Sequence, residues 1–162
     1  SIVYTDDYDP LAGRTFQRTL AGLLPGTRAV SIDARTTPAE LDSLLAAADN
    51  ADIVLFSPFV RVIASKGDIA IAAHVAEFVA RVAARRPTVV TSFGNPYVLA
   101  QFPDVGTYVL AWGPQDVLQE AAARALAGEA PITGKLPISI PPYHELGTGL
   151  RIEPRKASGS AP

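Results

Sequence analysis

Short apolar runs alternate with segments of helical period along most of the chain, and this alternation constrains the fold more than any other feature. The runs are continuous and rich in β-branched residues, which is typical of strands buried on both faces of a parallel sheet. They occupy residues 2–5, 29–32, 51–56, 88–93 and 107–111. The pattern predicts an α/β fold, an open, mostly parallel, doubly wound sheet of the flavodoxin or Rossmann type in a three-layer α/β/α sandwich.

Local signals mark where several helices begin or end. Thr37-Pro38-Ala39-Glu40 is a capping box with proline at the first helical position. Asn95 is expected to cap a short helix that begins at Pro96, and Gly128 stands where a helix usually ends. The predicted longer helices span residues 11–24, 38–48, 68–86 and 114–127.

The length and composition favour one domain. The chain has 162 residues, of which 48% are hydrophobic, and this is enough to build a core. We assign residues 1–152 to the domain and residues 153–162, which end in small and polar residues, to a flexible tail. The chain lacks methionine and begins inside a predicted strand, so we expect a piece of a longer protein.

Several classes of function find no support in the residues. A formal net charge of −2 provides no basic surface for nucleic acid or an anionic membrane. Neither GxGxxG nor GxxxxGK[ST] is present, so we expect no nucleotide cofactor, and no GxSxG elbow indicates a serine hydrolase. With no cysteine, and with His74 interpreted as a solvent-facing helix residue, we expect no metal site and no catalytic residue. No feature indicates the cellular compartment.

Three acids, Asp6, Asp7 and Asp9, follow the first predicted strand at the carboxyl edge of the sheet. Open α/β sheets bind ligands at this edge, and two adjacent carboxylates there resemble the magnesium pair of response-regulator receivers. A receiver also needs an aspartate at the end of the third strand, where this chain has Phe56-Ser57-Pro58. The alternative interpretation is that these acids form a turn ahead of a helix and are favoured by its dipole.

A second candidate is the loop after the central strand, which contains Arg61, Lys66 and Asp68. It carries both signs of charge beside Gly67 and would suit hydrogen bonding to a polyhydroxylated ligand. The alternative is that Asp68 caps the following helix while Arg61 and Lys66 are solvated. We take these three residues as the predicted substrate-binding residues.

The end of the chain, GKLPISIPPYHELGTGL from Gly134 to Leu150, is not needed by a generic α/β domain. Leu136, Ile138 and Ile140 alternate as if toward a core, and the prolines suit an edge or extended segment. Together with VVTSFGNPY from Val89 to Tyr97, and with Gln119-Glu120-Ala121-Ala122 and Ala125-Leu126-Ala127-Gly128, this ending resembles the C-terminal domain of glycoside hydrolase family 3. The resemblance covers residues 1 to about 152 and is strongest to the branch of bacterial β-N-acetylglucosaminidases.

In that family the catalytic aspartate lies on an N-terminal (β/α)₈ barrel, so the resemblance implies a barrel as the partner of this domain. The β-glucosidase branch also takes a glutamate acid/base from the loop after a central strand. The corresponding loop here, residues 59–68, has no glutamate and only Asp68 as a carboxylate. Retaining hydrolysis needs two carboxyl groups, or a substitute dyad, roughly 5 Å apart across the glycosidic bond. We therefore expect a domain that has no catalytic activity by itself. In its parent, an exo-acting β-N-acetylglucosaminidase or β-glucosidase, it would shape the sugar pocket.

A second hypothesis is a structural or interaction module fused to an unrelated hydrolase, such as a β-lactamase-like serine enzyme. The expected partners are the barrel or that other hydrolase domain, and carbohydrate.

Overall fold

The computed structural model describes residues 1–6, 9–60 and 71–155, which form a parallel sheet between two layers of helices. The strands are β1 (Ile2–Tyr4), β2 (Val30–Ile32), β3 (Val54–Pro58), β4 (Thr88–Ser92) and β5 (Thr107–Leu110), in the spatial order β2-β1-β3-β4-β5. Every neighbouring pair is parallel. The order reverses direction between β1 and β3, as in flavodoxin-like sheets. The predicted fold class is confirmed.

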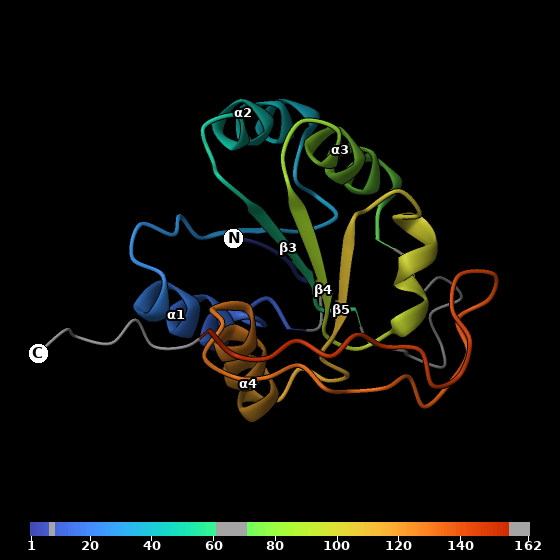
Figure 1. The fold of residues 1–162 in the computed structure, drawn as a ribbon. Helices are drawn as coiled ribbons and strands as arrows, with labels where there is room; N and C mark the ends of the chain where they lie inside the picture. Colours follow the sequence, from blue (N-terminus) through green and yellow to red (C-terminus); the bar gives the residue numbers. More distant parts are fainter. Residues whose placement is uncertain (7–8, 61–70, 156–162) are drawn as a thin grey trace, which may run out of the picture.

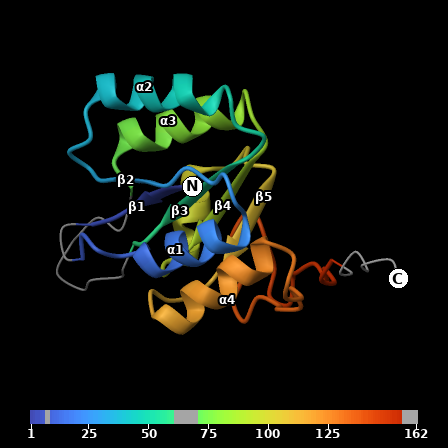
Figure 2. The same cartoon turned by 90° about the vertical axis from the view of Figure 1, so that its left-hand side faces the viewer.

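The helices divide between the two faces of this sheet (Figures 1 and 2). α2 (Pro38–Ala48), α3 (Ala73–Ala83) and the short 3₁₀ helix η1 (Pro96–Gln101) cover one face. α1 (Arg14–Leu23) and α4 (Asp116–Leu126) cover the other. Residues of successive strand positions therefore enter two different cores, one on each face.

The two cores are built from complementary positions of the same strands. Phe56 and Val90 face α2 and α3, whereas Val3 and Leu55 face α1 and α4. Phe16 of α1 is fully buried and meets Phe93 edge to face, with ring centroids 5.2 Å apart. The apolar runs that the sequence shows are continuous because both of their faces are covered.

The buried side chain of Gln119, a residue of α4, joins α4 to the start of α1. α1 begins after Gly13, which has no side chain to cap the helix, and the backbone N–H of Phe16 donates instead to Gln119 Oε1 at 3.0 Å. The amide nitrogen of Gln119 donates to the carbonyl of Pro114 at 2.6 Å. Gln119 thus accepts a hydrogen bond from the first turn of α1, which has no capping side chain of its own.

The predicted helix caps are confirmed at two places. The Thr37 side chain accepts from the Glu40 backbone, and the Glu40 carboxylate accepts from the Thr37 N–H at 2.8 Å, which completes the capping box of α2. Asn95 Oδ1 accepts from the Tyr97 N–H at 3.0 Å, which caps η1.

Other predicted boundaries are wrong because contacts distant in the sequence override the local pattern. Ile53 is 50% exposed and precedes β3, while Ser57 and Pro58, which lie beyond the predicted strand of residues 51–56, continue the strand. Pro58 cannot donate to the ladder, but its carbonyl accepts from Phe93 and the next N–H, of Phe59, donates to Tyr4, both at 2.9 Å. The neighbouring strands thus extend β3 through a proline.

α3 begins at Ala73 with Ala72 as its N-cap, not at Asp68. The side-chain amide of Gln101 pairs with both backbone groups of Ile71, at 2.8 and 2.9 Å, which ties this residue to η1 ahead of the helix. The helix also ends at Ala83, three residues before the predicted end.

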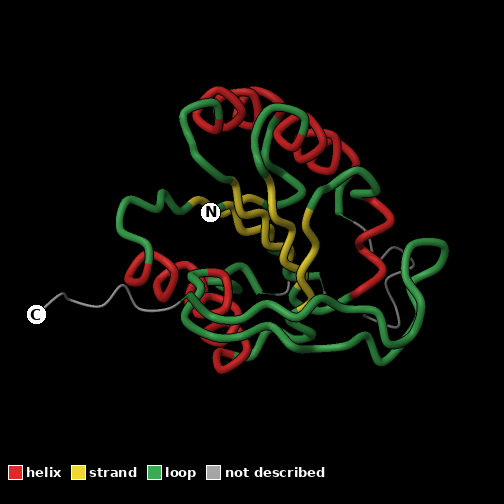
Figure 3. The backbone as a smooth tube through the Cα atoms, viewed as in Figure 1, coloured by secondary structure: helices red, strands yellow, loops and turns green. Residues whose placement is uncertain are grey.

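Residues 129–155 leave the end of α4 as a two-stranded antiparallel ribbon, visible as the paired loop segments of Figure 3. Ile132 and Ile152 exchange backbone hydrogen bonds at 2.9 and 2.8 Å, and Ile140 pairs with His144 around the Pro141-Pro142 turn. Ile140 is buried, Leu136 and Ile138 are half-buried, and residues 141–155 are exposed. The predicted extended segment is confirmed.

Candidate functional site

The carboxyl edge of the sheet is where an open α/β fold of this kind places a ligand, because the loops that follow the strands form a crevice there. The order reverses between β1 and β3, so the loops after these two strands flank the crevice. Of the described residues, those at this edge come from the segments 5–6 and 9–13, 33–37, 59–60, 93–95 and 111–115. Their side chains define the candidate site.

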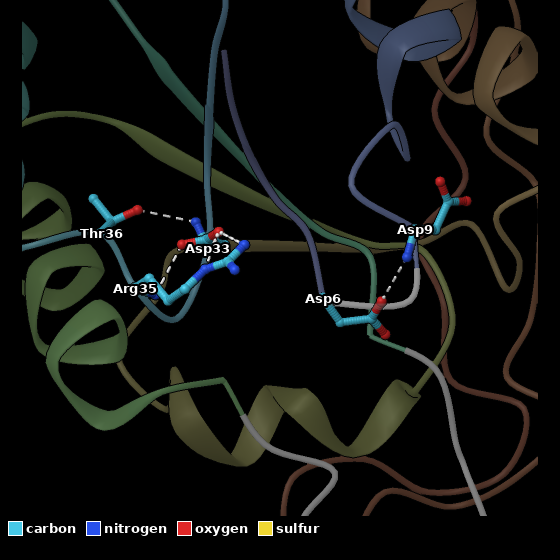
Figure 4. A network of polar contacts seen from close by, with 5 residues as sticks. All are labelled: Asp6, Asp9, Asp33, Arg35 and Thr36. Carbon is cyan, nitrogen blue, oxygen red and sulfur yellow. Dashed lines mark hydrogen bonds and ion pairs between the residues drawn. The ribbon is translucent and has the colours of Figure 1, made fainter.

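After β1, two carboxylates organise the turn that leads to α1 (Figure 4). Asp6 Oδ1 accepts from the backbone N–H of Asp9 at 3.2 Å, and Asp9 Oδ1 accepts from that of Leu11 at 3.2 Å. Both contacts are the local turns that aspartate forms with the backbone a few residues ahead. The interpretation of Asp6 and Asp9 as turn formers is therefore confirmed, while Asp7 lies outside the described residues. α1 has no acidic residue in its first turn, so an interaction with the dipole of this helix does not explain the positions of Asp6 and Asp9.

After β2, Asp33 and Arg35 form an ion pair (Figure 4). Arg35 Nη2 and Asp33 Oδ2 are 2.8 Å apart, and the N–H of Arg35 donates to Asp33 Oδ1 at 2.8 Å. The hydrogen bonds from the Arg35 side chain, with smaller contributions from backbone N–H groups, hold the pKa of the Asp33 carboxyl below its usual range. Asp33 therefore remains an anion at neutral pH and is not suited to act as a proton donor.

His74 is placed by this same loop. Its Nε2 lies 3.1 Å from the carbonyl oxygen of Thr36, and the side chain is half-buried. The prediction of a solvent-facing residue is wrong because the loop after β2 packs over the start of α3. The contact gives His74 a structural part in joining α3 to that loop.

After β4, the SFGNPY segment is an internally bonded turn. Ser92 Oγ donates to the carbonyl of Asn95 at 2.9 Å, and the N–H of Asn95 donates to Val60 at 3.1 Å. The Asn95 side chain is buried. Gly94 adopts a φ of 137°, in a region that favours glycine. This segment holds the loops after β3 and β4 together.

The floor of the site is aromatic. Phe59 and Phe93 stack with their ring centroids 4.3 Å apart and their planes 5° from parallel. Gly13 lies directly against this floor, since a Cβ there would stand 2.8 Å from Phe59 and 2.7 Å from Val3. The rings are buried, so they support the loops and are closed to a ligand.

After β5 the chain turns sharply at Trp112, a residue that sequence reasoning passed over. Trp112 has a φ of 64°, and the N–H of Gly113 donates to the carbonyl of Ala111 at 2.8 Å. The indole is 43% exposed. The available sequence signal was a lone tryptophan between a strand and a helix.

The three predicted substrate-binding residues, Arg61, Lys66 and Asp68, lie outside the described residues, so the structure neither brings them together nor separates them. Their loop leaves the carboxyl end of β3, beside the turn of Asp6 and Asp9 in the strand order. The N-cap of α3 is Ala72, which removes the interpretation of Asp68 as its cap.

A hollow of about 540 Å³ lies at the opposite, amino edge, among Arg85, Arg86, Thr88, Asp104 and Thr107. Arg86 turns inward to the carbonyl of Ala51, and Arg85 pairs with Asp49 at 3.2 Å. The arginines are thus engaged within the fold, and we assign no ligand to this hollow.

Over residues 1–6, 9–60 and 71–155, no cluster of three or more histidine, aspartate or glutamate side chains could hold a metal ion. Within the same ranges, none of the helices combines the length and the apolar character that crossing a bilayer requires.

Comparisons with known proteins point in one direction. The family model described as the glycosyl hydrolase family 3 C-terminal domain matches residues 14–157. A β-N-acetylglucosaminidase/β-glucosidase of Cellulomonas fimi is 42% identical over 52 residues, which are 32% of this chain and 9% of that protein. Among solved structures, a β-glucoside phosphorylase, BglX, superposes with a TM-score of 0.52 at 21% identity, covering 79% of this chain and 23% of that one. The last likeness shows the fold, and both relatives are much longer than this chain.

Proposed function

Since the chain belongs to the glycosyl hydrolase family 3 C-terminal domain family, we propose that it is the accessory domain of a glycoside hydrolase. Its parent would carry a catalytic (β/α)₈ barrel and remove β-linked N-acetylglucosamine or glucose from chain ends. The family match over residues 14–157 is the observation that carries this proposal. The Cellulomonas fimi relative, whose name states both activities, supports the substrate class.

The carboxylates at the carboxyl edge support a domain that has no catalytic activity by itself. Retaining hydrolysis needs two carboxyl groups, or a substitute dyad, across the glycosidic bond, and one of the two groups must give up a proton. Asp6 and Asp9 are engaged by backbone N–H groups, and Arg35 stabilises the anionic form of Asp33. These three described acids are held as turn formers and an ion-pair partner. The reacting carboxyl groups are therefore assigned to the barrel.

The part that this domain plays is to present loops to the sugar. Arg61, Lys66 and Asp68 remain our proposed sugar-contacting residues because their loop follows β3, next to the reversal of strand order. The stacked Phe59 and Phe93 beneath the edge, and the hydrogen bond from Asn95 to Val60, give these loops a rigid base. A rigid base of this kind keeps the cost of ordering a binding site low.

The test compares this chain, the barrel of its parent and the two joined in one polypeptide, on p-nitrophenyl β-N-acetylglucosaminide and p-nitrophenyl β-glucoside. We expect no product above buffer from this chain and higher kcat/KM from the joined protein than from the barrel. In the joined protein Arg61→Ala should raise KM, whereas Arg28→Ala, an exposed arginine just before β2, should not. Hydrolysis by this chain alone, or full activity of the isolated barrel, would contradict the proposal.

A further inference from the structure

Trp112 is the only tryptophan of the chain and stands at the carboxyl end of the edge strand β5. Trp112 is 43% exposed, although tryptophan is the largest apolar side chain and gains most from burial. Its exposure therefore leaves much of the possible packing unused. A role in the core does not account for this residue.

The backbone at Trp112 is strained. The hydrogen bond from Gly113 N–H to Ala111 C=O spans three residues, and with a φ of 64° it defines the form of γ-turn that is rare. Only glycine adopts positive φ without steric cost, so tryptophan is an unfavourable choice for this position. Strained backbone positions of this type cluster at active sites, ligand-binding sites and switch regions.

The segment around the turn is held in place on both sides. The N–H of Ala111 donates to Ser92 at the end of β4 at 2.9 Å. On the other side, the Pro114 carbonyl accepts from the buried Gln119 at 2.6 Å. Gly113 itself is buried, and a Cβ there would lie 3.1 Å from a methyl group of Leu118. The turn is thus fixed by the sheet and by α4, and the indole is presented from a rigid support.

We propose that Trp112 is a stacking platform for the pyranose ring of a saccharide at the carboxyl edge of the sheet. The saccharide class rests on the proposed function, while the platform rests on the geometry. The face of an indole carries partial negative charge, and the C–H groups on one face of a pyranose carry partial positive charge, so the two attract as they stack. The exposed Gln115 and Asp116, at the start of α4, supply amide and carboxylate groups close by in the chain for sugar hydroxyls.

The first experiment uses Trp112 as its own reporter, because no other tryptophan contributes to the emission. The full 162-residue chain is titrated with N,N′-diacetylchitobiose. We expect a saturable shift of the emission, and no shift with sorbitol, a polyol that lacks a ring face. An emission spectrum unchanged by the disaccharide would overturn the proposal.

Variants of Trp112 distinguish a saccharide-binding role of the indole from a structural role. Trp112→Gly should keep or raise the melting temperature, since glycine accepts the positive φ, and should lose saccharide binding measured by saturation-transfer NMR. Trp112→Phe should retain part of that binding, and Tyr97→Ala, which removes another exposed aromatic ring, should retain all of it. Unfolding of Trp112→Gly, or undiminished binding by it, would show that the indole is structural.

The two proposals fail in different ways. If the chain restores barrel activity but Trp112 does not respond to saccharide, the platform is refuted and the accessory role stands. If Trp112 responds to saccharide but the chain does not affect the activity of the barrel, the platform stands and the accessory role is refuted. A shift of emission on adding the barrel without any sugar response would identify the indole as a protein contact and overturn the platform.

Discussion

Different interactions stabilise residues 1–128 and residues 129–155. The sandwich formed by the first part buries two cores, one on each face of its sheet, and its buried side chains include Phe16, Phe56, Phe78 and Phe93. The ribbon formed by the second part buries Ile140 and relies on backbone pairs such as Ile132 with Ile152. Its anchor to the sandwich includes Arg155, whose N–H donates to Gly128 at 2.8 Å.

Part of the family signature therefore lies in the region that buries little apolar surface. The GKLP and GTGL segments, which carry part of the family resemblance, are mostly exposed in the ribbon. The sandwich holds most of the buried apolar surface, from which folding free energy chiefly comes. We therefore expect equivalent substitutions to act globally in the sandwich and locally in the ribbon.

The largest effect should follow Gly13→Ala. The new Cβ would stand 2.7 Å from Val3 and 2.8 Å from Phe59, and Gly13 has a φ of 82°. Positive φ and overpacking together should lower the free energy of unfolding by about 2–4 kcal/mol, measured by urea denaturation. Gly26→Ala is the control, because its φ of 92° is also positive but nothing lies within 4 Å of the new Cβ. Equal losses for the two variants would mean that the sheet can yield at Gly13.

A smaller and local effect should follow Gly149→Ala in the ribbon. The added Cβ would collide with the carbonyl oxygen of Gly134 on the opposite strand. The exposed strands can separate, so amide exchange should speed up at Leu136, Gly147 and Ile152, while the urea midpoint of the sandwich barely moves.

Gly134→Ala provides the matched control, since nothing lies within 4 Å of its new Cβ. Its exchange rates should stay near those of the unaltered chain. A loss of global stability in Gly149→Ala as large as that of Gly13→Ala would break the distinction between the two regions.

A further prediction concerns alkaline pH and the sandwich. Burial raises the pKa of Tyr108 to about 12, and its hydroxyl donates to the Pro96 carbonyl at 3.2 Å. The unfolded chain releases this proton near its ordinary pKa of 10.0, before the folded chain does. The stabilisation from the neutral phenol is thus complete below about pH 10 and is lost as pH rises toward 12.

Chemical denaturation of the unaltered chain and Tyr108→Phe across this pH range checks the prediction. The free energy of unfolding should fall more steeply for the unaltered chain. Parallel curves for the two proteins would show that the Tyr108 phenol titrates alike in both states.

Much of the fold could be predicted because its signals are local. Thr37 and Glu40 are three residues apart, and Asn95 caps the helix that starts at the next residue. The carboxyl edge could also be located, since it follows from strand direction alone. The site itself was less predictable. His74 is drawn to Thr36, 38 positions away, and Trp112 carries no pattern that would distinguish it from a core residue.

Local sequence patterns suffice to predict the alternation of strands and helices, the caps of α2 and η1, and the family. Contacts made in the folded chain set where α3 begins, how β3 continues through Pro58, what caps α1, and that Trp112 stands exposed on a strained turn. These contacts join residues that are far apart along the chain. Gln101 bonds to Ile71 across 30 positions, and Gln119 bonds to Phe16 across 103. A local pattern cannot specify such partners, because they meet only once the sheet has formed.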